Sequence, residues 1–134
     1  MFRFVILIPS YNEERTLKKI LNKIRKYQVY VINDCSTDNT KSLKNKFSNV
    51  VFINNEKNIG YENTLFKGFK ILKKKKFDYI ITMDADGEHS IASIKKGIVY
   101  CKKKSPDLVI GNRSRKNRFI EIIFSKIFYT RYKI

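Results

Sequence analysis

Short apolar stretches alternate along this chain with stretches of helical pattern, and this alternation limits the possible fold more than any other feature. Four near-continuous apolar runs are typical of strands that are buried on both faces. They occupy residues 2–8, 29–32, 50–53 and 79–83. After the first run, Leu17, Ile20, Leu21 and Ile24 recur at helical spacing. Strands that alternate with helices predict βαβ units and a mostly parallel sheet, and hence an α/β fold.

Two polar residues stand where helix caps are expected. Asp38 can cap a short helix that extends to Phe47, and Ser90 can cap a helix over residues 91–103. The remaining predicted elements are a helix over residues 61–74, a central strand in the run at residues 79–83, and a fifth strand over residues 107–110.

Polar residues follow three of the predicted strands at the point where each strand ends. These clusters are residues 9–13, 34–38 and 84–89. Each crossover of a parallel sheet returns the chain to the same edge, so the clusters meet in space although roughly 25 and 50 residues separate them. Ligands of open α/β sheets bind beyond the carboxyl ends of the strands. The sequence therefore predicts a ligand site at this edge.

Asp84 and Asp86 are the part of this edge with the most definite chemistry. The strand before them can be buried and the chain turns at Gly87, so both carboxylates emerge where the strand stops. Alternate residues of an extended segment point the same way, which lets the two carboxylates address one hard cation. An Asp-rich turn whose side chains bond their own backbone has the same short pattern. The rest of the chain favours the cation site.

The composition is that of a single globular domain with a large excess of positive charge. The chain has 134 residues, and 29 Lys and Arg residues against 12 Asp and Glu residues give a net charge of +17. This charge favours polyanions such as nucleic acid, anionic lipid or a nucleotide diphosphate. An AT-rich coding sequence also raises the lysine content, and we attribute most of the magnitude of the charge to that bias.

The sequence also bears on the cellular compartment. No apolar run approaches the ~20 residues that a membrane span needs, and the first residues do not resemble a signal peptide. Cys35 and Cys101 have neither the spacing of metal ligands nor that of a disulfide framework. We expect a chain that starts at Met1, stays inside the cell and keeps both thiols reduced.

The last segment, residues 119–134, differs in character from the rest. Its apolar residues lie on one broad helical face, with basic and aromatic residues interspersed. Such a helix suits the interface of an anionic membrane. The same pattern is equally typical of an ordinary amphipathic helix that packs on the domain or on a further part of the protein.

Five motifs occur in a fixed order along the chain, and together they are far more specific than any one of them. They are Ile8-Pro-Ser-Tyr-Asn-Glu-Glu14, Val31-Ile-Asn-Asp-Cys-Ser-Thr-Asp38, Asn58-Ile-Gly60, Met83-Asp-Ala-Asp-Gly-Glu-His89 and Gly111-Asn-Arg113. They resemble the N-terminal part of inverting glycosyltransferases of family 2. The resemblance is strongest to the branch of dolichol-phosphate mannosyltransferases and bacterial polyprenyl-phosphate glycosyltransferases, and it covers nearly all of residues 1–113.

The resemblance implies the GT-A fold, a Rossmann-like nucleotide-diphospho-sugar transferase fold with a mostly parallel sheet flanked by helices. It implies that residues 1–118 form an incomplete nucleotide-sugar-binding domain, truncated after the donor-binding half, and that residues 119–134 form a basic amphipathic helix. The donor would be a UDP- or GDP-sugar and the acceptor a polyprenyl or dolichyl phosphate. The protein would be cytoplasmic and peripheral to the cytoplasmic face of an anionic membrane, with no nucleic acid as partner.

The resemblance also assigns roles to residues. Pro9, Tyr11 and Glu13 would line the nucleotide, with Tyr11 against the base and Glu13 near the ribose. Ile32 and Asp34 would hold the edge of the base, because a carboxylate is a natural acceptor for ring N–H groups.

The cation and the diphosphate would be held by the fourth motif and by two arginines. Asp84, Asp86 and Glu88 would form the metal shell for Mg²⁺ or Mn²⁺, with Asp86 the more direct ligand, and Ala85 would contact the substrate. Arg113 and Arg118 would neutralise phosphate charge. Asp86 and Arg113 would thus be the catalytic residues. A polyprenyl phosphate is already anionic at neutral pH, so transfer to it needs little or no general base.

Three residues depart from the family pattern. Asn33 replaces the first Asp of the usual Asp-Asp pair, Cys35 stands where Gly is common, and Thr64 stands where a small Ala is usual. The chain is also shorter than members of this branch, which leaves three hypotheses open. The first is that the chain is a glycosyltransferase or its donor-binding portion, completed by a second polypeptide or by self-association. The second is that it is a non-catalytic partner protein. The third is that it is a basic nucleic-acid-binding module, although no recognised motif of that class is present.

Overall fold

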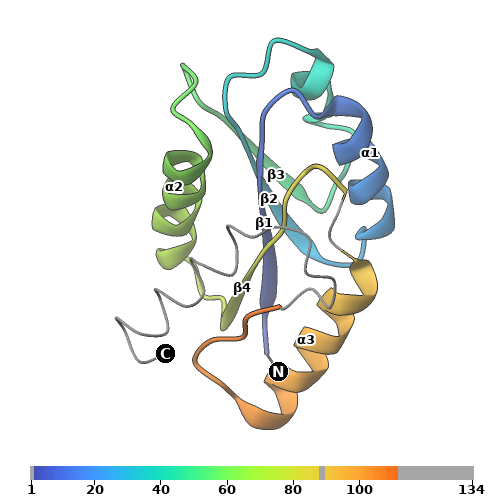
Figure 1. Cartoon of the computed structure of the whole chain (residues 1–134), viewed down its shortest axis with the longest axis vertical. Helices are drawn as coiled ribbons and strands as arrows, with labels where there is room; N and C mark the ends of the chain where they lie inside the picture. Colours follow the sequence, from blue (N-terminus) through green and yellow to red (C-terminus); the bar gives the residue numbers. More distant parts are fainter. Residues whose placement is uncertain (1, 88–89, 112–134) are drawn as a thin grey trace, which may run out of the picture.

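The computed structural model of the chain describes residues 2–87 and 90–111 (Figure 1). In chain order the described elements are β1 (Phe4–Ser10), α1 (Glu14–Lys23), β2 (Gln28–Asn33), the 3-10 helix η1 (Asn39–Leu43), β3 (Val50–Asn54), α2 (Tyr61–Lys73), β4 (Tyr79–Thr82) and α3 (Ile91–Lys104). Within this part of the chain, the four strands form one sheet in the order β3-β2-β1-β4, and all neighbours run parallel. The predicted α/β fold with a parallel sheet is therefore confirmed.

The order of the strands creates a reversal beside β1. The chain moves from β1 outward to β2 and β3, and then crosses back so that β4 pairs with the other side of β1. Pairing of Ser10 with Asn33 and of Leu7 with Thr82 brings the ends of β1, β2 and β4 to the same edge. Ligands of open α/β sheets bind at such a reversal.

Helices cover both faces of the sheet. On one face, Ile6 and Ile8 of β1 pack with residues of α1 and α3, and on the other face Val5 and Leu7 pack with Leu72 of α2. Figure 1 shows α2 on one side of the sheet and α1 and α3 on the other. All four of these β1 side chains are completely buried, which explains why the first apolar run has no polar alternation.

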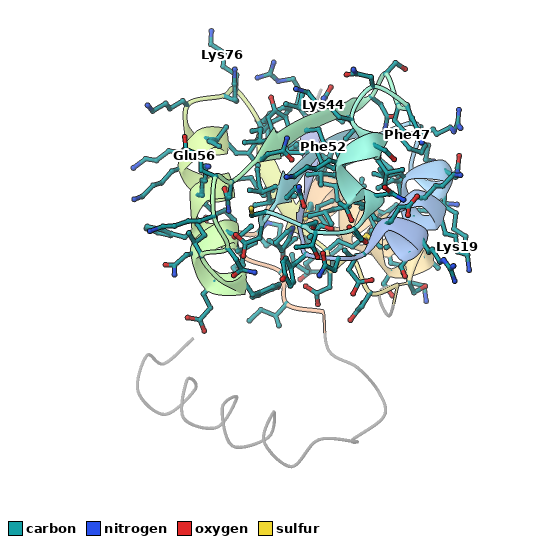
Figure 2. The ribbon with its side chains drawn as sticks, turned by 90° about the horizontal axis from the view of Figure 1, so that it is seen from above. Lys19, Lys44, Phe47, Phe52, Glu56 and Lys76 are labelled. Carbon is teal, nitrogen blue, oxygen red and sulfur yellow. The ribbon has the colours of Figure 1, made fainter. Side chains whose placement is uncertain are left out.

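Aromatic residues of the η1 and β3 region close the α1 side of the core. Phe47 and Phe52 are buried and belong to the same cluster as Ile6 and Ile8. Seen from above, both lie inside the outline of the fold, whereas Lys19 and Lys76 extend away from the ribbon (Figure 2). The two aromatic side chains therefore belong to the core between the sheet and the helices, whereas these two lysines extend into solvent.

Three sequence predictions about elements were wrong. The strand at residues 79–83 was expected to be central, but within the described residues β4 pairs with β1 alone and forms an edge. Residues 107–110 form no strand in the described structure, and Leu108 and Ile110 are 62% and 76% exposed. Without a neighbouring ladder, an apolar run has no partners for its backbone groups.

The helix after Asp38 is also shorter than predicted. The Asp38 side chain accepts a hydrogen bond from the Thr40 amide, so the predicted cap is confirmed, but the helix is a 3-10 turn that ends at Leu43. Asn45 follows with a φ of 103°, which a helix cannot accommodate. The predicted Ser90 cap of α3 is confirmed by a 3.2 Å bond from the Ala92 amide to the Ser90 hydroxyl.

The three α-helices of the described part carry lysines in their last turns. These are Lys23 in α1, Lys70 and Lys73 in α2, and Lys102, Lys103 and Lys104 in α3. Cations are favourable at helix C-termini, where the macrodipole is negative. Crossover helices run opposite to the strands of a parallel sheet. These lysines therefore lie at the edge of the sheet where the strands begin, opposite to the carboxyl ends of the strands. None of the helices described here is long and apolar enough to cross a membrane.

We predict opposite effects for two glycine-to-alanine substitutions in helices. A Cβ at Gly68 of α2 would come within 2.5 Å of Leu7, which is completely buried, so Gly68→Ala is expected to lower the free energy of unfolding by about 1–3 kcal/mol. A Cβ at Gly97 of α3 meets nothing within 4 Å. Gly97→Ala should therefore raise the free energy of unfolding by about 0.5–1 kcal/mol through helix propensity. Urea denaturation of both variants tests the pair, and equal effects would contradict the close packing of α2 on β1.

Candidate functional site

A pocket with a volume of about 240 Å³ opens at the end of β1, beside the reversal of strand order. Its walls come from the ends of β1 and β2, the loop after β3, and the first turn of α2. The lining residues are Pro9, Ser10, Tyr11, Asp34, Asn58, Gly60, Tyr61 and Thr64. The predicted meeting of strand ends at one edge has thus produced a concave site.

Asp34 is the buried acid of this pocket, with only 3% of its surface exposed. Its Oδ1 accepts hydrogen bonds from the Asn55 side chain at 2.8 Å and the Ile59 amide at 2.9 Å. Its Oδ2 accepts one from the Gly60 amide at 2.9 Å. Burial alone raises the pKa of the Asp34 carboxyl, but these bonds outweigh burial and hold the pKa below its usual value. Asp34 is therefore a carboxylate at neutral pH.

Asn55 extends this network beneath the pocket. Its amide nitrogen also donates to the Thr64 hydroxyl at 3.0 Å, and its oxygen accepts from the Lys67 ammonium at 2.7 Å. Asn55 is 5% exposed and Thr64 is completely buried. Asn55 and Lys67 were not predicted as site residues, because Asn55 stands in a polar loop and nothing in the sequence pattern distinguishes a buried Asn from an exposed one.

The loops after β1 and β2 are joined by a second set of hydrogen bonds. The Asn12 side chain accepts from the Thr37 amide at 2.8 Å, and the Asn12 amide donates to the Ser36 hydroxyl at 2.9 Å. The Asp38 carboxylate accepts from the amides of Thr40 and Glu14. Burial raises the pKa of Asp38, and these hydrogen bonds more than reverse that effect. The start of α1 is thereby tied to the end of β2.

The predicted nucleotide residues occupy different environments. Pro9 and Tyr11 line the pocket, and 47% of the Tyr11 surface is exposed, so its ring is accessible to a ligand. Glu13 is partly exposed at the start of α1, and its amide donates to the Thr40 hydroxyl at 3.2 Å. Ile32 is completely buried on the α2 side of the core, and its side chain does not line the pocket.

The predicted cation residues follow β4. Asp84 is partly exposed and Asp86 is exposed, whereas Ala85 between them is buried. The Tyr61 hydroxyl donates to Oδ1 of Asp84 at 2.7 Å and so joins the pocket to this edge. Burial, this bond and the nearby carboxylates raise the pKa of Tyr61, which keeps the hydroxyl protonated and able to donate. Glu88, Arg113 and Arg118 lie outside the described residues.

The residues after β4 suit a cation that is shared with a ligand. Among the described residues, no group of three or more His, Cys, Asp or Glu side chains could enclose a metal ion. Mg²⁺ is usually bound through one or two carboxylates together with substrate phosphates and water. Asp84 and Asp86 supply two carboxylates from one strand end, so this donor set fits Mg²⁺ or Mn²⁺ held jointly with a phosphorylated ligand.

Comparison with known proteins identifies the family. Residues 5–132 match the model of glycosyl transferase family 2, which is nearly the whole chain. The chain belongs to glycosyl transferase family 2. The resemblance inferred from the five sequence motifs is thus confirmed, and the parallel sheet is consistent with the N-terminal part of a GT-A fold.

Several curated proteins are similar to this chain. An uncharacterized protein of Methanocaldococcus jannaschii is 35% identical over 84% of the chain and 53% of its own length. The UDP-N-acetylglucosamine–dolichyl-phosphate N-acetylglucosaminyltransferase of Methanococcus voltae is 28% identical over 81% of the chain and 51% of its own length. The dolichol-phosphate mannosyltransferase of Pyrococcus furiosus is 29% identical over 87% of the chain and 34% of its own length. The chain spans about half or less of these relatives.

We predict that Asp34 makes folding stability depend on acid pH. Its pKa is lower when folded than in the unfolded chain, so the unfolded chain binds more protons and stability falls as the pH falls below about 4. Asp34→Asn should lower the free energy of unfolding at pH 7 by about 1–3 kcal/mol, because its NH₂ group cannot accept from a backbone amide. The variant should also lose less stability than the wild type between pH 5 and pH 3.

Thermal unfolding across this pH range measures both effects. Asp107→Asn, which changes an exposed acid outside the pocket, is the matched control and should follow the wild type. A parallel decline for wild type and Asp34→Asn would contradict the assigned role of the Asp34 hydrogen bonds.

Proposed function

We propose that this family 2 glycosyltransferase chain binds a UDP- or GDP-sugar with Mg²⁺ or Mn²⁺ and is the donor-binding part of an enzyme that transfers the sugar to a lipid phosphate with inversion. The observation that carries this proposal is the adjacency of a pocket and two carboxylates. Tyr61 lines the pocket and hydrogen-bonds Asp84, so a ligand in the pocket extends naturally toward Asp84 and Asp86.

The two parts of the site suit the two ends of a nucleotide diphosphate. The pocket offers the accessible Tyr11 ring and the flat Pro9 wall for a base, together with the Asp34 carboxylate as an acceptor. Asp84 and Asp86 suit the cation that accompanies the diphosphate. When bound, that cation supplies Lewis-acid stabilisation of the leaving diphosphate.

The charge distribution favours a donor that binds together with its cation. The candidate site gathers the carboxylates of Asp34, Asp84 and Asp86, although the chain as a whole carries a net charge of +17. A nucleotide diphosphate without a cation would approach these carboxylates against repulsion. The residues of this chain would therefore hold the donor as a metal complex, with Arg113 and Arg118 contributing further positive charge.

A lipid phosphate is the acceptor that agrees best with the family branch. The Methanococcus voltae relative acts, by its name, on dolichyl phosphate. A phosphate oxygen is already anionic at neutral pH, so it attacks without a strong general base. We assign donor binding to residues 1–118 and, on their amphipathic pattern, membrane contact on the cytoplasmic side to residues 119–134.

We predict metal-dependent nucleotide binding that requires Asp86. Calorimetric titration of the full chain with UDP and with GDP, each with and without Mn²⁺, should reveal one nucleotide that binds more tightly with the metal. Asp86→Ala should weaken the Mn²⁺-dependent binding by about 100-fold or more, because loss of a mere outer-shell partner already costs about 10–100-fold and this substitution removes the charged ligand itself.

Asp107→Ala provides the control, since it removes an exposed carboxylate away from the pocket and should bind like the wild type. Metal-dependent binding that survives unchanged in Asp86→Ala would refute the assignment of the metal ligands. Absence of binding of either nucleotide to the wild type would refute the proposed donor function.

A further inference from the structure

Tyr61 combines two properties that are unusual in one side chain. It is the first residue of α2, and 54% of its surface is exposed. Its hydroxyl is nevertheless engaged by a carboxylate 23 residues further along the chain, at 2.7 Å from Asp84 Oδ1. A tyrosine that is half exposed contributes little to stability through burial of its ring. The position of its hydroxyl beside a carboxylate therefore calls for another explanation.

The backbone that carries Tyr61 is held in place from the opposite side of the pocket. Asp34 at the end of β2 accepts from the amides of Ile59 and Gly60, the two residues before Tyr61. Gly60 has a φ of 84°, a conformation that suits glycine, and its carbonyl accepts the first helical bond of α2 from the Thr64 amide. These hydrogen bonds therefore fix the backbone at the start of α2, from which the Tyr61 side chain extends.

Because of the strand order, these contacts connect the residues after β2 with those after β4. Asp34 follows β2 and Asp84 follows β4, and β1 lies between these two strands. The connection from Asp34 through residues 59–60 and Tyr61 to Asp84 hence crosses the end of β1. Tyr61 lines the pocket, and its hydroxyl contacts the carboxylate after β4.

We propose that Tyr61 is the positioning residue that aligns Asp84 for the cation and thereby couples cation binding to occupancy of the nucleotide pocket. This inference rests on the proposed donor function and goes beyond it, because neither the family motifs nor the predicted site include Tyr61. Hydrogen bonds to a metal-ligating carboxylate fix its orientation, and their loss typically weakens metal binding 10–100-fold. The ring and the hydroxyl have separable tasks. The ring forms the pocket wall, and the hydroxyl orients Asp84.

The experiment separates these two tasks with two substitutions in the full chain. Tyr61→Phe removes the hydroxyl and keeps the ring, whereas Tyr61→Ala removes both. Tyr100→Phe is the matched control, because Tyr100 lies on α3 and is 51% exposed, close to the 54% of Tyr61. For each protein, calorimetry measures the affinity for the nucleotide without metal and the affinity for Mn²⁺ at saturating nucleotide.

The two variants should give different patterns. Tyr61→Phe should bind the nucleotide without metal within twofold of the wild type, and its Mn²⁺ affinity should fall about tenfold. Tyr61→Ala should lose both affinities, and Tyr100→Phe neither. In an Asp84→Asn background, Tyr61→Phe should cause no further loss of Mn²⁺ affinity, because the carboxylate that it orients is gone.

Two results would overturn the inference while leaving the proposed function intact. One is wild-type Mn²⁺ affinity in Tyr61→Phe, which would mean that the hydroxyl adds stability alone. The other is equal loss of metal-free nucleotide affinity in Tyr61→Phe and Tyr61→Ala, which would mean that the hydroxyl acts on the nucleotide. A wild-type chain that binds neither ligand would overturn the proposed function and this inference together. Circular dichroism of each variant checks that it is folded.

Discussion

The carboxylate of Asp34 is the group on which the rest of the candidate site depends. Taking a charge out of water is costly unless hydrogen bonds replace those of the solvent. Asp34 obtains them from Asn55 and from the backbone amides of Ile59 and Gly60. The benefit is mutual, because the Ile59 amide precedes a helix and obtains its acceptor from Asp34, while the Gly60 amide donates both to Asp34 and to the Asn58 side chain. One side chain thus sets the position of a loop, the start of α2 and one wall of the pocket.

The net charge of the chain does not describe the local charge at either edge of the sheet. Lysines concentrate in the last turns of the α-helices, where the helix dipole favours them, while the carboxylates of Asp34, Asp84 and Asp86 gather beyond the strand ends. A composition of +17 would by itself suggest direct binding of a polyanion. The candidate site has the opposite local character, with three carboxylates and a net negative charge of its own. The location of the charges is therefore more informative than their sum.

Much of the fold could be predicted because the relevant constraints are local. Burial on both faces of β1 leaves a continuous apolar run, and the caps at Asp38 and Ser90 are read from single residues. The edge position of β4 could not be predicted, since strand order depends on which side of β1 the chain returns to. The run at residues 107–110 resembles a strand by composition, but pairing is a tertiary property.

The candidate site was predictable to the extent that its residues belong to motifs at strand ends. Pro9, Tyr11 and Asp34 were expected there, and they line the pocket. Asn55 and Tyr61 were missed, because their importance comes from contacts with residues 21 and 23 positions away. Ile32 is a different case. Its motif suggested ligand contact, but alternation along β2 directs its side chain into the core.

The edge position of β4 gives the two halves of the site separate local stabilities. In the described part of the chain, β4 is attached to the sheet by the ladder to β1, whereas β1 and β2 each have neighbours on both sides. A fluctuation that opens this ladder displaces Asp84 and Asp86 but leaves the strands that carry Pro9, Tyr11 and Asp34 paired. The segment with Asp84 and Asp86 can thus open while the pocket persists. Ligands that join the two halves would suppress this opening, so they would protect the amides of β4 from hydrogen exchange.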